Sequence, residues 1–209
     1  MIAHKICDND NNRVWVAGQL VSGFEYSYEA YGKRYYTSTL KVTRLSDEVD
    51  YIPIMATEYL ARKHSDCTGQ TICVIGQFRS YNWHLTGENR LRLCVFAKEI
   101  EPMGIFKIGG RENNEIWLDG FLCKPPVYRK TPLGREITEL TVAVNRSYQK
   151  SDYIPCICWN RNARTASVLP VGAHIQIYGR IQSRKYTKRL EGTEEKRITY
   201  EVSVYKIIG

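Results

Sequence analysis

The chain has 209 residues, of which 43% are hydrophobic and 25% are charged, a composition typical of a globular protein. No apolar run approaches the roughly 20 residues that a membrane-spanning helix needs, so we expect no contact with a membrane. The N-terminus lacks the apolar core of a signal peptide, and the seven cysteines include no Cys-x-x-Cys pair. We therefore expect a cytoplasmic protein whose cysteines are reduced core thiols.

The net charge of +8 is confined to one half of the chain. Residues 1–103 contain 12 Lys and Arg against 12 Asp and Glu, whereas residues 104–209 contain 18 against 10. A basic half joined to a neutral half predicts a polyanionic partner for the basic half.

The sequence repeats itself at a nearly constant offset. The offset is 102 residues between segments 12–18 and 114–120 (NRVWVAG and NEIWLDG) and between segments 50–53 and 152–155 (DYIP in both), and 103 residues from Gly76 to Gly179 and from Ser80 to Ser183. This pattern predicts a duplicated domain. We expect one copy over residues 1–103, a linker over 104–112, and a second copy over 113–209, because Pro102, Gly104, Gly109 and Gly110 interrupt the strand pattern there.

Each copy is expected to contain five strands, with one short helix between the third and the fourth. In the second copy the strands are predicted near residues 115–123, 137–147, 153–159, 173–184 and 198–207, with the helix in 160–169; the helix of the first copy is predicted at 57–64, opening with a capping-type threonine. This order predicts an all-β protein with two tandem OB folds, each a five-stranded Greek-key barrel. Glycines in the first and fourth strands are expected to let bent strands close each barrel, namely Gly18, Gly76, Gly120 and Gly179.

The third strand of the second copy carries the first functional signal. Ile154, Cys156 and Cys158 share one face, which suits a core, whereas Tyr153 and Trp159 stand at the two ends of the other face. The fourth strand alternates as well, with Ile175, Ile177, Gly179 and Ile181 on its inner face and Tyr178, Arg180, Arg184 and Tyr186 on its outer face. Flat aromatic surfaces for bases and cations for phosphates are what sequence-tolerant binding of single strands requires.

The second copy resembles the bacterial single-stranded DNA-binding protein family. The likeness runs through residues 114–120, 140–146, 152–159 and 177–186 (IYGRIQSRKY), and it covers essentially all of 113–209. The first copy resembles the same family more weakly, through residues 12–18, 50–53 and 76–80.

The resemblance implies four base-stacking positions in each copy. In the second copy they hold Tyr148, Tyr153, Trp159 and Tyr186; in the first copy they hold Ser46, Tyr51, Thr57 and Trp83, so two of its aromatics are missing. Residue chemistry and resemblance together predict a nucleic-acid interface made of Tyr148, Tyr153, Trp159, Tyr178, Arg180, Arg184, Lys185, Tyr186, Lys188, Arg189 and Arg146, with Tyr51, Arg79 and Trp83 from the first copy. No cofactor, metal site or catalytic group is expected.

The function implied is non-catalytic binding of single-stranded DNA in replication, recombination or repair, in the nucleoid of a bacterium. Two alternatives stay open: an adaptor of a primosome, phage or mobile element whose first domain binds replication or recombination proteins, and an RNA-binding OB protein. By analogy with the family we also expect a homodimer that brings four OB folds together, with the first strands, which contain Trp15 and Trp117, as contact edges. The resemblance implies an acidic tail that recruits partners in this family, but the last predicted strand leads directly to Gly209, so we do not expect recruitment by a tail.

A tyrosine-rich hairpin is predicted at residues 24–36. So many tyrosines in one loop indicate either base stacking or a contact with another protein, because tyrosine is favoured at interfaces. Two glutamates within the loop favour the protein contact.

Overall fold

The computed structural model describes residues 11–83, 90–103, 113–147, 149–190 and 193–209. The predicted linker at 104–112 therefore lies outside the described residues. No helix in the part of the chain that is described is long and apolar enough to cross a membrane.

Each sequence copy folds into strands with one α-helix in the predicted place. The first copy contains β1 (Asn12–Leu20), β2 (Glu25–Ala30), β3 (Lys33–Thr43), β4 (Val49–Thr57), α1 (Glu58–Lys63), the 3-10 turn η1 (Ser65–Cys67), β5 (Thr71–Trp83) and β6 (Arg90–Pro102). The second contains β7 (Asn114–Leu122), β8 (Val127–Lys130), β9 (Glu136–Arg146), β10 (Lys150–Trp159), α2 (Arg161–Ser167), β11 (His174–Leu190) and β12 (Thr193–Ile208).

Five strands of each copy close into a ring. In the first copy β1 pairs with β3 and β5, β3 with β4, β5 with β6, and β4 with β6 in parallel. The second copy repeats this circuit through β7, β9, β10, β12 and β11, again with one parallel pair, β10 with β12. The all-β barrel predicted from the sequence is confirmed, whereas the division into independent domains stays a prediction.

Each copy also has a sixth strand that the five-strand prediction did not include. β2 and β8 lie outside the rings and pair with β3 and β9 as hairpins. All four residues of β8 are exposed, so no buried-and-exposed alternation marks this strand in the sequence.

Glycine is required where the barrels turn their corners. A side chain at Gly76 would overlap the carbonyl oxygen of Phe96, and one at Gly179 would lie 2.5 Å from the carbonyl oxygen of Ser203. The β5–β6 and β11–β12 registers shift at these two glycines. The expected role of the glycines in bending the strands thus has a steric basis.

The core follows the alternation of the strands. Ile175, Ile177 and Ile181 are fully buried, as are Ile154 and Cys158 on β10. The described cysteines are free thiols, and burial raises the pKa of Cys158 to about 12. The thiol of Cys158 is therefore a packing group at neutral pH, as expected from the sequence.

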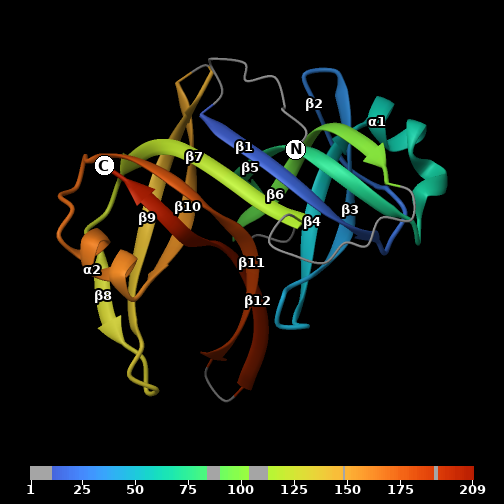
Figure 1. Ribbon diagram of the computed structural model, residues 1–209. Coiled ribbons are helices and arrows are strands. Elements are labelled where there is room, and N and C mark those ends of the chain that lie inside the picture. The colour runs from blue at the N-terminus through green and yellow to red at the C-terminus, as the bar shows by residue number, and fades with distance from the viewer. Residues whose placement is uncertain (1–10, 84–89, 104–112, 148, 191–192) are drawn as a thin grey trace.

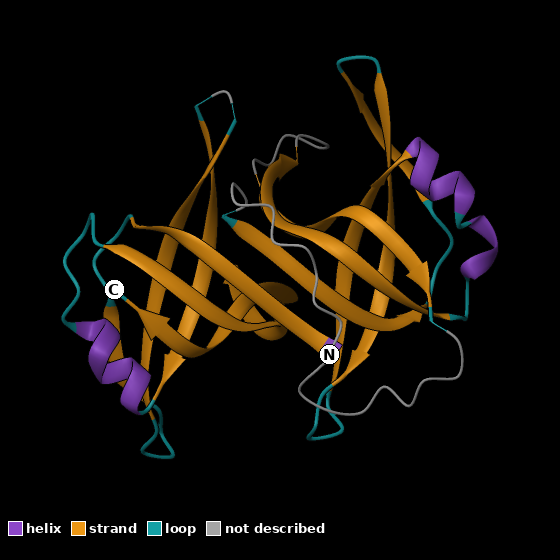
Figure 2. Ribbon diagram, turned by 45° about the horizontal axis from the view of Figure 1, so that its top comes forward, coloured by secondary structure: helices purple, strands orange, loops and turns teal. Residues whose placement is uncertain are grey.

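The two barrels are joined edge to edge by their first strands (Figure 1). β1 pairs antiparallel with β7, so that Val14 lies opposite Ile116, the residue at the same position of the repeat. All twelve strands therefore belong to one continuous sheet, with the helices at its two outer ends (Figure 2). The expectation that the first strands are free edges for contact between chains is wrong, because each edge is occupied by the other within one chain.

Candidate nucleic-acid interface

An aspartate near the start of the third ring strand in each copy is hydrogen-bonded to a serine of the other copy, and we call each of these contacts a clamp. Asp50 on β4 is fully buried and accepts hydrogen bonds from the backbone N–H and the hydroxyl of Ser183 on β11, at 2.7 and 2.8 Å. Arg44 donates to both carboxylate oxygens of Asp50, at 2.7 and 2.6 Å. Burial alone would raise the pKa of Asp50, but the hydrogen bonds from Arg44 and Ser183 hold it below its ordinary value.

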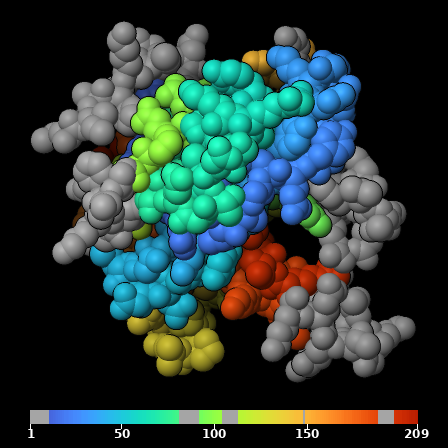
Figure 3. Space-filling model, turned by 90° about the vertical axis from the view of Figure 1, so that its right-hand side faces the viewer, coloured from blue at the N-terminus to red at the C-terminus, as the bar shows by residue number. Residues whose placement is uncertain are grey.

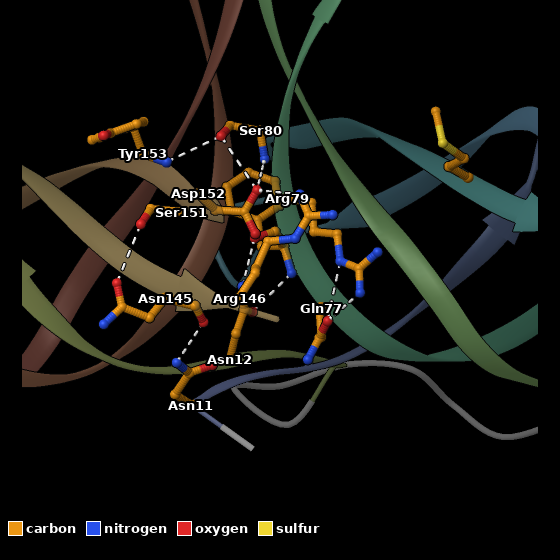
Figure 4. A network of polar contacts seen from close by, with 12 residues as sticks. Asn11, Asn12, Gln77, Arg79, Ser80, Asn145, Arg146, Ser151, Asp152 and Tyr153 are labelled. Carbon is orange, nitrogen blue, oxygen red and sulfur yellow. Dashed lines mark hydrogen bonds and ion pairs between the residues drawn. The ribbon is translucent and has the colours of Figure 1, made fainter. Parts of the chain in front are cut away.

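The repeat supplies the same clamp in the opposite direction (Figure 4). Asp152 on β10 accepts hydrogen bonds from the N–H and the hydroxyl of Ser80 on β5, at 2.9 and 3.3 Å. Here Arg146 makes one contact, at 3.3 Å, and all of these donors use the same carboxylate oxygen. The other oxygen of Asp152 is buried without a hydrogen-bond partner in the described structure, and burial raises the pKa of this carboxyl.

The clamps place one predicted stacking residue of each copy beside the other copy. Tyr153 follows Asp152, and its backbone N–H donates to the hydroxyl of Ser80 at 3.0 Å. Tyr51 follows Asp50 and so lies beside Ser183 (the first copy and the β11–β12 hairpin meet in Figure 3). Both residues are 48% exposed, so neither side chain is buried by the clamp beside it.

The other end of β10 carries Trp159, which is half-buried where the strand meets α2. Trp159 is six positions after Tyr153, so the two aromatics stand about 20 Å apart along the strand. The fourth predicted strand is not the neighbour of β10, because β12 lies between β10 and β11. The stacking residues of the second copy are therefore spread over its surface rather than gathered on adjacent strands.

The predicted residues of β11 lie in three different surroundings. Tyr178 faces Trp117 across the β7 pairing, and the amine of Lys206 lies 5.4 Å above its ring. Arg180 is half-buried beside the first copy, and burial followed by repulsion from Arg44 lowers its pKa.

Closer to the hairpin tip, Arg184, Lys185 and Tyr186 are exposed. Arg184 is within ion-pair distance of Glu139 and Glu201, at 3.5 and 3.6 Å. Part of the positive charge expected on this hairpin is thus neutralised by the protein's own carboxylates.

Four predicted site residues are not fully described. Tyr148 lies outside the described residues, and only the backbone is described for Trp83, Lys188 and Arg189. The remaining two, Arg79 and Arg146, come from different copies and lie beside Asp152 (Figure 4).

Sequence reasoning missed an aromatic cluster around Arg79. The guanidinium carbon of Arg79 lies 4.1 Å from the ring centre of Phe96, and Phe96 contacts Tyr35, which stacks on Tyr28 with centroids 5.0 Å apart. The tyrosine-rich loop signalled two of these residues, but β6 gave no sign that Phe96 would join them. Among the described residues, no group of three or more His, Cys, Asp or Glu could hold a metal ion.

The comparisons with known proteins agree with this architecture. The wild-type single-stranded DNA binding protein from Thermus aquaticus matches with a TM-score of 0.74 and 24% identity over 94% of this chain and 91% of that chain, so the two share a fold over both barrels. A deletion mutant of the same protein matches with a TM-score of 0.72 and 23% identity over 94% and 93% of the two chains.

Sequence comparison adds closer relatives of the second copy. Single-stranded DNA-binding protein B of Bacillus subtilis is 36% identical over 80 residues, which are 35% of this chain and 71% of that protein. Single-stranded DNA-binding protein 3 of Listeria innocua is 36% identical over 92 residues, which are 41% of this chain and about half, 55%, of that protein. The model of the single-strand binding protein family matches residues 113–208. The chain therefore belongs to the single-strand binding protein family.

Proposed function

We propose that this protein binds single-stranded DNA with little sequence preference and without catalysis. The observation that carries the proposal is the pair of exposed tyrosines, Tyr51 and Tyr153, each held by a buried clamp beside the long hairpin of the other copy. A base that is unpaired offers a flat face to such a ring, whereas the bases of a duplex are stacked on one another. Membership of the family and the names of the relatives support the same function.

Stacking and phosphate contacts contribute differently to the affinity. Each base stacked on an aromatic is worth about 1–3 kcal/mol. Lysine and arginine neutralise phosphates, and for single strands the logarithm of the affinity falls against the logarithm of the salt concentration with a slope of about −0.7 per neutralised phosphate. The processes served are replication, recombination or repair of DNA in the bacterial cytoplasm and nucleoid.

A titration of oligo-dT, a duplex and oligo-U at two salt concentrations tests the proposal. We expect quenching of tryptophan fluorescence by oligo-dT, a strong loss of affinity at high salt, and weak binding of the duplex. Equal affinity for duplex and single strand would overturn the proposal. Stacking on aromatic rings does not distinguish DNA from RNA, because it makes no contact with the 2′-hydroxyl. A preference for oligo-U would therefore identify the protein as an RNA-binding member of the fold.

A second candidate function rests on the first copy. Ser46 and Thr57 occupy two positions where the second copy has aromatics, which favours an adaptor whose first barrel contacts replication or recombination proteins. An affinity for oligo-dT that is unchanged when Tyr51 is replaced would support this adaptor.

We also propose a homodimer that brings four barrels together. Because β1 and β7 pair with each other, the contact would use the outer face of the joined sheet, where Trp15 and Trp117 are partly exposed. A monomer by light scattering at micromolar concentration would contradict the dimer.

A further inference from the structure

A cleft of about 910 Å³ lies where the two copies meet, and neither copy forms it alone. One wall consists of the β2–β3 hairpin with β5 and β6 of the first copy, and the other of the β9–β10 turn of the second copy. Its volume falls within the range of pockets that hold small ligands. The cleft therefore has room for part of a polymer that runs from one copy to the other.

The wall from the first copy is aromatic. Tyr28 and Tyr35 are stacked with an interplanar angle of 28°, and Phe96 continues the row at 5.8 Å from Tyr35. Tyr31, at the hairpin tip, also lines the cleft and is 94% exposed. Tyr26 and Tyr36 pack against each other and do not line the cleft, so the hairpin divides its tyrosines between two sides.

The cleft is positively charged. Four cations line it, Arg79 and Lys98 from the first copy with Arg146 and Lys150 from the second, against one anion, Asp152. Arg79 and Arg146 both line the cleft beside Asp152 (Figure 4). Burial lowers the pKa of Arg79, and repulsion from Arg146 lowers it further. A group carrying a negative charge between them would relieve this repulsion.

The matching place in the second copy carries different polar and charged residues. Gln182 stands where the first copy has Arg79 and donates at 2.8 Å to Glu201, which stands where the first copy has Cys94. The turn that faces it has Glu48 where the β9–β10 turn has Lys150. Arg184 lies near Glu201 and Glu139, so the charges there are balanced within the protein.

We propose that this cleft is a binding site for the single strand in which a backbone phosphate lies between Arg79 and Arg146 and neighbouring bases stack on the tyrosines of the β2–β3 hairpin that line the cleft. The proposal rests on the proposed function and extends it: the tyrosine-rich hairpin supplies the first copy with aromatics in place of those missing at Ser46 and Thr57. The strand then passes from one copy to the other across the cleft.

An acidic peptide is the competing ligand for a cationic, aromatic cleft. The stacked tyrosines favour nucleic acid, because a base can stack on a ring while its phosphate contacts the guanidiniums of Arg79 and Arg146. The Asp152 carboxylate beside the cations is compatible with either ligand, and a crosslink from oligo-dT to the hairpin would identify nucleic acid as the ligand.

Photo-crosslinking of the full chain with oligo-dT that contains 5-iodo-deoxyuridine tests the site directly. We expect crosslinks, mapped by mass spectrometry, at Tyr31 or Tyr28. Tyr31→Ser is expected to lower the affinity for oligo-dT about 5-fold, the effect of losing one stacked base. Because Tyr31 is exposed, this variant should fold normally, and Arg62→Gln on α1 serves as a surface control that leaves binding unchanged.

The salt dependence tests the phosphate contact. Arg146→Gln should make the slope of log affinity against log salt shallower by about 0.7, whereas Arg146→Lys should retain the wild-type slope. If the wild type binds oligo-dT but crosslinks map only to the second barrel and these variants bind normally, the cleft proposal is wrong while the proposed function stands. Failure of the wild type to bind any single strand would instead overturn the proposed function, and with it the cleft.

Discussion

Asp50 and Ser183 are 133 residues apart in the chain, yet the buried carboxylate of Asp50 accepts two hydrogen bonds from Ser183. Asp152 and Ser80 repeat the contact in the reverse direction. The pair thus fastens each barrel to the other at equivalent points on either side of the β1–β7 junction. The two clamps differ in how well hydrogen bonds and arginine compensate the charge of the carboxylate. This difference can be measured as a difference in unfolding free energy between variants.

Asp50→Asn should destabilise the protein far more than Asp152→Asn. The first change removes the charge that faces the bidentate Arg44, and breaking a buried ion pair costs about 3 kcal/mol. In the second, the charge that is removed is poorly compensated, because one carboxylate oxygen has no hydrogen-bond partner and burial raises the pKa of the group, so we expect a cost below about 1 kcal/mol. Urea unfolding of both variants at pH 7 measures the difference; equal losses of unfolding free energy would contradict it.

The two carboxyls should also give opposite pH dependences. The pKa of Asp50 is lowered in the folded state, so its contribution is present above the ordinary value of 3.8 and is lost as the pH falls through the folded pKa. The pKa of Asp152 is raised, so its protonated form favours folding below 3.8, and that contribution is lost as the pH rises through the folded pKa. The loss of unfolding free energy caused by Asp50→Asn should therefore become smaller below about pH 4. The unfolding free energy of Asp152→Asn relative to wild type should instead fall there. Unfolding at pH 7, 5 and 3.5 checks both signs.

Asn12 and Asn114 each hold the backbone of a bent strand. The side chain of Asn12 donates to the carbonyl of Phe78 at 2.7 Å and accepts from its N–H at 2.9 Å, and Asn114 makes the same two bonds with Ile181. Replacing either with alanine leaves two buried backbone groups without partners, at about 1–3 kcal/mol for each group. We expect a loss of at least about 2 kcal/mol in urea unfolding.

Asn162 is the control for this prediction, because its side chain donates to the carbonyl of Tyr205 at the surface. Asn162→Ala should change the unfolding free energy by less than about 0.5 kcal/mol. A loss from Asn12→Ala no larger than that from Asn162→Ala would show that the two bonds contribute nothing net.

Tyr51→Ala and Tyr153→Ala should weaken binding of oligo-dT to a similar extent. The two residues are equally exposed and are placed by equivalent clamps, so each variant should lose one stacked base, or about 1–3 kcal/mol. Tyr59→Ala is the matched control, because Tyr59 is an exposed tyrosine on α1 that no clamp positions. Fluorescence titration checks the three variants; a normal affinity of Tyr51→Ala would mean that the first copy does not take part through this residue.

The sequence by itself determined the duplication, the barrel class and the inward faces of the strands, because these depend on local alternation and on matches at one offset. Ile177 and Cys158 are buried as the alternation requires. The exposed β8 lacked that signal, and the free edges assigned to β1 and β7 were wrong because pairing between the copies leaves no mark in either strand alone.

The tertiary structure alone decided which residues share a site. Charges counted along the chain made the first half neutral, yet Arg146 and Lys150 of the second half meet Arg79 and the aromatic row of the first in one cationic cleft. Tyr153 is placed by Ser80, which precedes it by 73 residues. Such contacts depend on how two barrels dock, and docking is set by the sum of many weak interactions across the β1–β7 junction rather than by any motif that either copy contains.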